Sequence, residues 1–370
     1  MDADAAAPHP PETVAALGEF ALIARLAGVL AETGAAAAPD LLGIGDDAAV
    51  WMPTPGTRGV ITVDSLIADV HFRLDWTGPR DLGHKALAVN LSDIAAMGAR
   101  PRLAVVSLGL TGGERVAWVL DLYRGLGALA ARYGVVVAGG DIVAAPDRLG
   151  LHVTVVGESW PEAGGRVLRR DGARPGDLIA VSGPLGLSAA GLRLLQSSVV
   201  GRRSSDALGL PAAGDGGRED DETAALLTAH HRPEPRVEYG RALVEAGASA
   251  AMDLSDGLWG DLAKICARSG VGARVEEAAL PVPAAVRRRF PDRWLDLATR
   301  GGEDYELLFT LDAPALERLG KRCRALGLPT PAPIGTILPS PPSGGPIVLR
   351  RADGTEASVA GGAFDHFGGV

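Results

Sequence analysis

Acidic residues gather in five places, and many of them lie at the ends of strand-like runs beside Gly or Ser. They are Asp46 and Asp47 in GIGDD, Asp64 in TVDS, Asp93 in NLSD, Asp141 in GGD, and Asp253 with Asp256 in MDLSDG. Magnesium ions prefer oxygen ligands and keep several waters, so a few carboxylates and substrate phosphate oxygens make a site. Two or three such ions would neutralise a triphosphate and stabilise charge on a transferring phosphoryl group. The pattern favours metal-assisted phosphate chemistry.

Each group also has a structural explanation, and the residues alone leave both open. Asp47 fits an ordinary Gly-Asp turn, and Asp64 fits a turn at a strand end. Asn90 and Asp93 share one face of an apolar helical pattern, which suits either a buried hydrogen-bond network or a metal site. Asp253 and Asp256 could simply mark a helix N-terminus, with Ser255 or Asp256 as its cap.

Glycine-rich turns supply further candidates. Gly140 and Asp141 follow a VVVA run, and together they offer backbone amides beside a carboxylate for a nucleotide's phosphates. A tight turn explains them equally well. The tract from Ser182, SGPLGLSAAGL, resembles a phosphate-binding turn but fits close packing at least as well. The sequence contains no G-x-x-x-x-G-K-[ST] tract, and neither cysteine has the context of an activated nucleophile, so P-loop and covalent chemistry are disfavoured.

Composition limits the class of partner. The chain has 370 residues, 47% hydrophobic and 22% charged, with a formal net charge of -9. That charge disfavours nucleic acid as a partner, whereas bound cations would still let an acidic protein hold phosphates. Cys266 and Cys323 lack metal-type spacing, and no apolar run approaches the length of a membrane span. A cytoplasmic protein without a membrane or nucleic-acid partner is expected.

The elements that would position these residues alternate in type. Helices are expected at 19–34, 81–98, 117–133, 188–196 and 256–270, and strands at 43–52, 59–72, 102–110, 135–141, 150–159, 177–183 and 305–311. This order predicts an α/β or α+β chain of two domains. Expected boundaries are a disordered extension at 1–17, an N-terminal domain at 18–160, and a C-terminal α/β domain at 161–370 with a mobile insertion at 197–222.

Several motifs in order resemble the thiamine-monophosphate kinase family. They are GEFALIARLA, GIGDDAAV, TVDSL, HKALAVNLSDIAAMGARP, GGDIV, RRDGARPGD, MDLSDGL, GGEDYELLFT and the terminal FDHF, which together run from Gly18 to Phe367. The family belongs with aminoimidazole ribonucleotide synthetase and selenophosphate synthetase. The resemblance implies their two-domain fold, with the N-terminal sheets of two subunits forming a barrel in a homodimer and ATP in the cleft between domains.

The resemblance also implies roles for particular residues in an ATP- and Mg²⁺-dependent kinase that converts thiamine monophosphate to thiamine diphosphate by direct in-line transfer. No residue would act as a covalent nucleophile, and metal-held charge would stabilise the reaction. The implied metal set is Asp47, Thr62, Asp64, Asp93, Asp141, Asp253 and Asp256. The implied ATP contacts are Gly140, Asp141, Arg170 and Ser255, and the implied substrate contacts are His71, Glu303 and Phe364.

Two positions depart from the family pattern, and rival functions remain. Val63 stands where the family often has a hydroxyl residue, and Asp69 stands where Gly is common. A selenophosphate synthetase would carry a reactive Cys in an N-terminal loop, yet the first cysteine is Cys266. An aminoimidazole ribonucleotide synthetase would lack GGEDYEL together with the terminal DHF. A nucleotide-binding regulatory protein without turnover is the alternative from another class.

Overall fold

The structure is a computed structural model that describes residues 11–36, 38, 41–45, 47–201, 218–340 and 347–359. Contacts divide the chain into two compact units. The first falls within Met1–Met52, Val63–Leu87 and Leu103–Thr154, and the second within Pro53–Thr62, Ala88–Arg102 and Val155–Val370. Each unit is therefore built from several separate stretches of chain.

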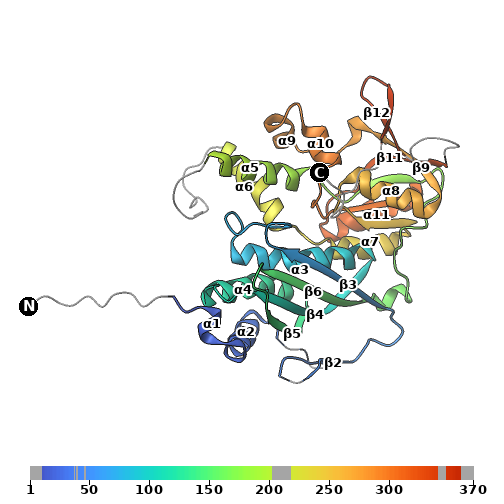
Figure 1. Ribbon diagram of the computed structural model, residues 1–370. Helices are drawn as coiled ribbons and strands as arrows, with labels where there is room; N and C mark the ends of the chain where they lie inside the picture. The colour runs from blue at the N-terminus through green and yellow to red at the C-terminus, as the bar shows by residue number, and fades with distance from the viewer. Residues whose placement is uncertain are drawn as a thin grey trace, which may run out of the picture. The chain divides into compact units, whose positions relative to one another are not determined.

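A four-stranded sheet in the order β3-β6-β4-β5 supports the predicted acidic residues of the N-terminal half (Figure 1). Its strands are β3 (Gly59–Ile67), β4 (Ala99–Leu110), β5 (Val136–Ala144) and β6 (Gly150–Ser159). Strands β4 and β5 run parallel, with Val106 opposite Gly140 and Ser107 opposite Asp141. All four strands were predicted from the sequence, which is confirmed.

The predicted strand at 43–52 is wrong over most of its length. Only β1 (Leu41–Leu42) and β2 (Val50–Trp51) form, as a two-stranded antiparallel pair. Gly45 has a φ of 123°, which extended β structure does not use. Asp47 therefore lies in an exposed loop between the two short strands.

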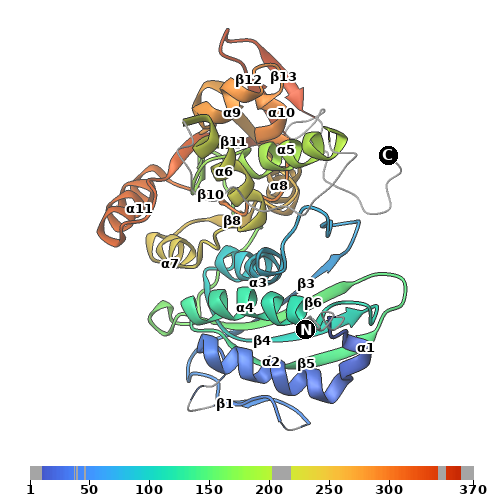
Figure 2. The ribbon, with the colours of Figure 1, turned by 90° about the vertical axis from the view of Figure 1, so that its left-hand side faces the viewer.

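Helices pack on one another beside this sheet. They are α1 (Val14–Leu17), α2 (Glu19–Thr33), α3 (Pro79–Ala96) and α4 (Val116–Arg132), and α1 falls within residues assigned above to an extension. Helices α2 and α4 lie side by side in both views (Figures 1 and 2). A Cβ at Gly83 in α3 would lie 1.9 Å from the Leu122 carbonyl oxygen in α4, so these two helices cross with their backbones in contact.

The second unit is organised by a seven-stranded, mostly antiparallel sheet in the order β13-β12-β9-β11-β7-β10-β8. Its strands are β7 (Leu178–Val181), β8 (Ala250–Asp253), β9 (Val271–Glu276), β10 (Leu307–Leu311), β11 (Ala332–Pro339), β12 (Ile347–Arg350) and β13 (Glu356–Val359). Every residue of β8 and β10 is buried. One of the loops that carry predicted site residues follows β8, and the other precedes β10.

Helices of the second unit complete its core. They are α5 (Leu187–Gly201), α6 (Arg218–His231), α7 (Val237–Ala246), α8 (Leu258–Ser269), α9 (Ala284–Arg289), α10 (Trp294–Thr299) and α11 (Ala313–Leu326), with short 3₁₀ turns η1 (Pro161–Ala163) and η2 (Glu277–Ala279). Buried Trp259, Leu262 and Ile265 of α8 join the core of the sheet. The insertion expected at 197–222 begins inside α5 and ends inside α6, and residues 202–217 lie outside the described chain.

Two further sequence expectations can be compared with the structure. In the parts of the chain that are described, no helix has both the length and the apolar character needed to cross a bilayer. Cys266 and Cys323 are both buried free thiols. Burial raises the pKa of the Cys266 thiol to about 11, which leaves it protonated and unreactive near neutral pH.

The α3–α4 crossing yields a stability prediction with an internal control. Gly83→Ala should lower the free energy of unfolding by about 2–3 kcal/mol, because its methyl group would meet a backbone carbonyl. Gly28→Ala in α2, where a Cβ meets nothing within 4 Å, should raise it by about 0.5–1 kcal/mol. Urea denaturation of both variants measures the difference. Equal stability of the two variants would contradict the close crossing.

Candidate functional site

Two loops at the ends of β8 and β10 form the centre of the candidate site in the second unit. We call residues 253–257 the DLSDG loop and residues 301–306 the GGEDYE loop. The amide of Glu303 donates to the carbonyl of Ser255 at 2.9 Å, and two more backbone hydrogen bonds of 2.8 and 2.9 Å join the loops. The antiparallel pairing of β8 with β10 thus continues into both loops.

Close approach of the loops explains the glycine at position 302. A Cβ at Gly302 would lie 2.3 Å from the Ser255 carbonyl oxygen, so a side chain there would push the loops apart. Glu303 and Tyr305 have φ values of 66° and 50°, in the left-handed region that side-chain-bearing residues rarely adopt. Each such residue costs on the order of 1 kcal/mol and is often found at functional sites. The GGEDYE loop is therefore held in a conformation that its sequence does not favour.

Asp304 anchors this loop to the start of α5. Its two carboxylate oxygens accept hydrogen bonds from the amides of Gly186 at 2.7 Å and Ser188 at 3.2 Å. Some of the residue's surface remains exposed, yet the carboxyl group itself faces the protein, and desolvation raises its pKa to about 7. The same two amide donors act in the opposite direction, because they favour the ionised form.

Glu306 anchors the other end of the loop through a buried ion pair. The Ser182 hydroxyl donates to Glu306 at 2.5 Å, and the Arg236 guanidinium bonds both carboxylate oxygens, with Nε to Oε2 at 2.8 Å. The side chain of Glu306 is 5% exposed. A buried carboxylate of this kind is tolerated because its charge is paired and its lone pairs are used.

Asp261 of α8 holds the DLSDG loop in a similar way. Its Oδ2 accepts the amides of Ser255 at 3.1 Å and Asp256 at 3.0 Å, and Lys264 donates to its Oδ1 at 2.8 Å. Burial raises the pKa of Asp261, and the Lys264 ammonium partly offsets this. Lys264 also donates to Asp256 at 2.5 Å. The cap of α8 is Gly257, so the interpretation of Asp256 as a helix cap is wrong.

Asp253 and Asp93 are two of the predicted metal ligands, and both belong to the second unit. Asp253 is 3% exposed and accepts a hydrogen bond of 2.8 Å from the Ser92 hydroxyl. Desolvation, followed by repulsion from Asp93, raises the pKa of Asp253 to about 7, while Arg170 and Ser92 oppose the rise. Asp93 itself accepts a hydrogen bond of 2.5 Å from the Thr62 hydroxyl. Repulsion between the carboxyl groups would be relieved by a cation.

The donor chemistry of these residues fits magnesium, although no cage is assembled in advance. Across the described ranges, no three His, Cys, Asp or Glu side chains gather closely enough to hold a metal ion. Magnesium sites commonly use one or two carboxylates, with water and phosphate oxygens completing the octahedron. The Asp93 and Asp253 pair, flanked by two hydroxyl groups, meets that requirement.

In strand β3, the side chains around Asp64 point alternately to opposite faces. Side chains at positions i and i+2 of a strand project from the same face. Thr62 and Asp64 are related in this way, and both are partly buried. Val63 lies on the opposite face and is 61% exposed. The missing hydroxyl at position 63 therefore points away from the face that carries Thr62 and Asp64. Asp46 and Phe364 lie outside the described residues.

The remaining residues predicted in the first unit are placed as follows. A Cβ at Gly140 would lie 1.9 Å from the Val106 carbonyl oxygen, so packing of β5 on β4 requires this glycine whether or not it binds ATP. Asp141 follows it and is exposed. The Nδ1 atom of His71 accepts the Ile67 amide at 3.1 Å, which leaves a proton on Nε2 of the neutral ring.

Asp69, noted above as a departure from the family pattern, has a backbone conformation that favours glycine. Its φ of 62° is left-handed, and its amide donates to the Phe72 carbonyl at 2.7 Å in a tight turn. Asp tolerates this conformation better than most residues, because its short side chain can bond locally. The turn thus keeps its geometry without a glycine, and the exposed carboxylate is the chemical difference.

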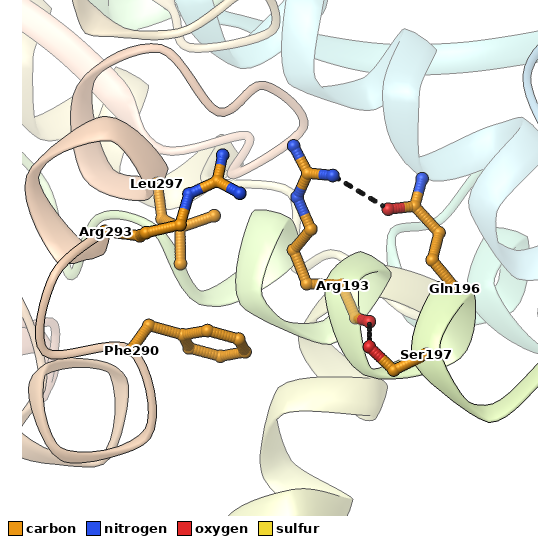
Figure 3. A pocket seen from close by; sticks show the side chains of 6 residues that line it. All are labelled: Arg193, Gln196, Ser197, Phe290, Arg293 and Leu297. Atoms are coloured by element: carbon orange, nitrogen blue, oxygen red, sulfur yellow. Dashed lines mark hydrogen bonds between the residues drawn. The ribbon is translucent and has the colours of Figure 1, made fainter. Parts of the chain in front are cut away.

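A separate cavity of about 470 Å³ lies elsewhere in the second unit (Figure 3). Its lining comprises Arg193, Gln196, Ser197, Phe290, Arg293 and Leu297. Figure 3 shows the Arg193 guanidinium reaching Gln196, with the hydrogen bond at 3.1 Å. None of the described residues predicted to bind metal, ATP or substrate lines it, so this cavity is not part of the predicted site.

Sequence reasoning missed the side chains that hold the loops, namely Ser92, Ser182, Arg236, Asp261 and Lys264. Asp304 enters the sequence analysis only as part of the GGEDYELLFT motif. Their partners are distant in sequence, and Ser92 and Asp253 are 161 residues apart. One local signal was available: Asp261 and Lys264 are spaced i, i+3 on a predicted helix directly after DLSDG.

Known proteins share both the domains and the motifs of this chain. Residues 45–159 match the AIR synthase related protein, N-terminal domain, and residues 174–345 match the corresponding C-terminal domain. These matches and the two mixed α/β units confirm the predicted fold class. The chain is a two-domain protein of the AIR synthase related class.

Comparison with individual relatives shows which family within this class the chain belongs to. The chain is 36% identical over 326 residues to thiamine-monophosphate kinase of Bacillus subtilis, covering 88% of this chain and 93% of that protein. A crystal structure of thiamine-monophosphate kinase from Stenotrophomonas maltophilia K279a superposes with a TM-score of 0.75 at 39% identity, covering 94% of this chain and all of that one. The structure of AaThiL complexed with AMPPCP and TMP superposes with a TM-score of 0.68 at 30% identity, covering 95% of this chain and 97% of that one. The chain belongs to the thiamine-monophosphate kinase family.

The raised pKa of Asp253 gives a pH-dependent stability prediction. The folded state keeps a proton that the unfolded state loses above about pH 4, so the native state loses stability as pH rises towards 7. Asp253→Asn removes that ionisation. In EDTA, the variant's stability relative to the parent should be greater at about pH 8 than at about pH 5, by on the order of 2 kcal/mol.

Urea denaturation at both pH values measures this difference. Ser92→Ala keeps the carboxyl group but removes a hydrogen bond that opposes the rise in its pKa, so this control should lose stability with rising pH at least as steeply as the parent. An Asn variant whose relative stability is the same at both pH values would show that Asp253 is ionised in the folded protein throughout.

Proposed function

We propose that this chain transfers the γ-phosphoryl group of ATP to the phosphate of thiamine monophosphate, giving thiamine diphosphate and ADP. Family membership and the relative complexed with AMPPCP and TMP support this assignment. The observation that carries it is the joined pair of loops, in which a backbone hydrogen bond links Ser255 to Glu303 while Asp253 ends the paired strand β8. These are residues to which the motif resemblance gives metal, nucleotide and substrate roles.

The proposal divides the site residues into three groups. Carboxylates and one hydroxyl would hold Mg²⁺: Asp47, Thr62, Asp64, Asp93, Asp141, Asp253 and Asp256. ATP would meet Gly140, Asp141, Arg170 and Ser255. Thiamine monophosphate would meet His71, Glu303 and Phe364. Bound Mg²⁺ would neutralise phosphate charge and help to stabilise the charge that develops on the transferring group.

Transfer needs no protein nucleophile. An oxygen of the substrate phosphate forms a bond to the γ-phosphorus as the bond from that phosphorus to the β,γ-bridging oxygen breaks, and ADP leaves with the bonding electrons. Arg170 supplies a permanent positive charge for phosphate oxygens, and its guanidinium acts electrostatically on Asp253. Glu303 offers a carboxylate complementary to the cationic thiazolium or the amine of the substrate. Alignment and charge stabilisation account for most of the rate in this class of reaction.

We also propose a homodimer in the cytoplasm. Ile61 is 71% exposed and Val63 is 61% exposed, at alternate positions on one face of β3, and exposed apolar side chains of this kind suit a subunit interface. Sedimentation velocity measures the oligomeric state, and a monomer at all micromolar concentrations would contradict the homodimer.

The cytoplasmic location is a separate point. Two free, buried thiols are compatible with a reducing compartment.

Turnover tests the proposed function directly. Purified protein with ATP, Mg²⁺ and thiamine monophosphate should form thiamine diphosphate and ADP in equal amounts. Asp64→Asn should lower kcat by at least about 100-fold, because it removes charge and little shape. Asp121→Asn, the same change at a surface ion pair with Arg80 and Arg124, should leave kcat within about twofold.

Two outcomes would contradict the proposal. ADP formation at the background rate, with ATP still bound tightly, would favour a nucleotide-binding regulatory protein. Full activity in the Asp64→Asn variant would show that the metal role is assigned to the wrong residue.

A further inference from the structure

His230 is a buried side chain next to the candidate site with no role in the mechanism above. It is 5% exposed and lies near the C-terminal end of α6. Its Nδ1 atom lies 3.1 Å from the Ser188 hydroxyl and 3.5 Å from Oε2 of Glu303. The imidazole thus reaches the carboxylate that is proposed to contact thiamine monophosphate.

These contacts close a ring that includes the GGEDYE loop. Glu303 contacts His230, His230 bonds the Ser188 hydroxyl, and the Ser188 amide donates to Asp304, the residue after Glu303. Ser188 is 1% exposed, so the ring of contacts is shielded from competing water on that side. A side chain held in such a ring has few alternative orientations.

Packing of α5 against α6 fixes the position of the imidazole. A Cβ at Gly191 would lie 2.2 Å from the Leu226 carbonyl oxygen and 3.1 Å from the Cβ of His230, so the two helices are in backbone contact. Leu226 is buried in the apolar cluster between these helices. Because the helices are in backbone contact here, His230 cannot shift far from Ser188 without disturbing that packing.

We propose that His230 is a positioning residue for substrate recognition, holding the Glu303 carboxylate in the orientation that meets thiamine monophosphate. This inference rests on the proposed function. The side chain of Glu303 is 28% exposed, and an unrestrained glutamate would lose rotamer freedom on binding. The backbone of Glu303 is already fixed in its left-handed conformation. With His230 in place, both backbone and side chain are ordered before the substrate arrives, which improves affinity.

Steady-state kinetics on three variants tests the role. His230→Leu should raise the KM for thiamine monophosphate about tenfold, while the KM for ATP and kcat stay within about twofold. His230→Asn restores a polar atom near the position of Nδ1 and should recover the KM to within about threefold of the parent. Ile347→Ala, in the core at β12, should lower the melting temperature without changing either KM, because three strands separate β12 from β10 and the GGEDYE loop.

A double-mutant cycle separates positioning from a general structural effect. If His230 acts through Glu303, His230→Leu should raise the KM for thiamine monophosphate by less than about twofold in a Glu303→Gln background. An unchanged KM in the single His230→Leu variant would overturn the role of His230. So would an equal rise in Ile347→Ala, or full additivity with Glu303→Gln.

The same measurements distinguish this inference from the function on which it rests. A parent protein that does not phosphorylate thiamine monophosphate overturns the proposed function and the inference together. A parent with normal turnover whose Glu303→Gln variant keeps its KM overturns the substrate role of Glu303, and with it the role of His230. Normal turnover, a raised KM in Glu303→Gln and no effect of His230→Leu overturn the inference alone.

Discussion

Backbone hydrogen bonding between the DLSDG and GGEDYE loops is the constraint on which the candidate site depends. It continues the β8–β10 pairing beyond the sheet and sets the distance between Ser255 and Glu303. The loops can approach only because position 302 is glycine, and they meet only because Glu303 and Tyr305 accept left-handed backbone conformations. The rest of the second unit supplies the interactions that offset this strain.

Those interactions come largely from carboxylates turned into the protein. Asp261 and Asp304 each accept two backbone amides, and Glu306 forms a buried ion pair with Arg236. Burial raises the pKa of Asp253 as it does those of Asp261 and Asp304, but Asp253 has one hydroxyl donor and is also repelled by Asp93. The acidic residues therefore fall into two kinds: anchors that accept two or more hydrogen bonds from the protein, and a pair whose mutual repulsion a cation would relieve. This division explains how one loop pair serves both structure and chemistry.

Much of this arrangement could be predicted from the sequence. Motif order identified Asp253, Ser255 and Glu303, and β-branched runs located all four strands of the N-terminal sheet. The bond from Thr62 to Asp93, across 31 residues, and the bond from Ser92 to Asp253 depend on tertiary packing, which local pattern does not encode. The expected strand at 43–52 failed because apolar composition suggested extended chain while Gly45 adopts a φ of 123°. The position of Asp256 just before a helix suggested that it caps that helix. Its carboxylate instead accepts a hydrogen bond from Lys264, which lies within the helix.

Amide hydrogen exchange on the protein without ligands tests most directly whether the loop pair is ordered in advance. The amides of Leu254, Glu303 and Tyr305 each donate across the loops and should exchange nearly as slowly as those of β10. Slow exchange at all three, before any nucleotide or substrate is added, is the predicted result. Exchange at the rate of exposed chain, with protection appearing only after ligand is added, would mean that substrate builds the site and would contradict the account.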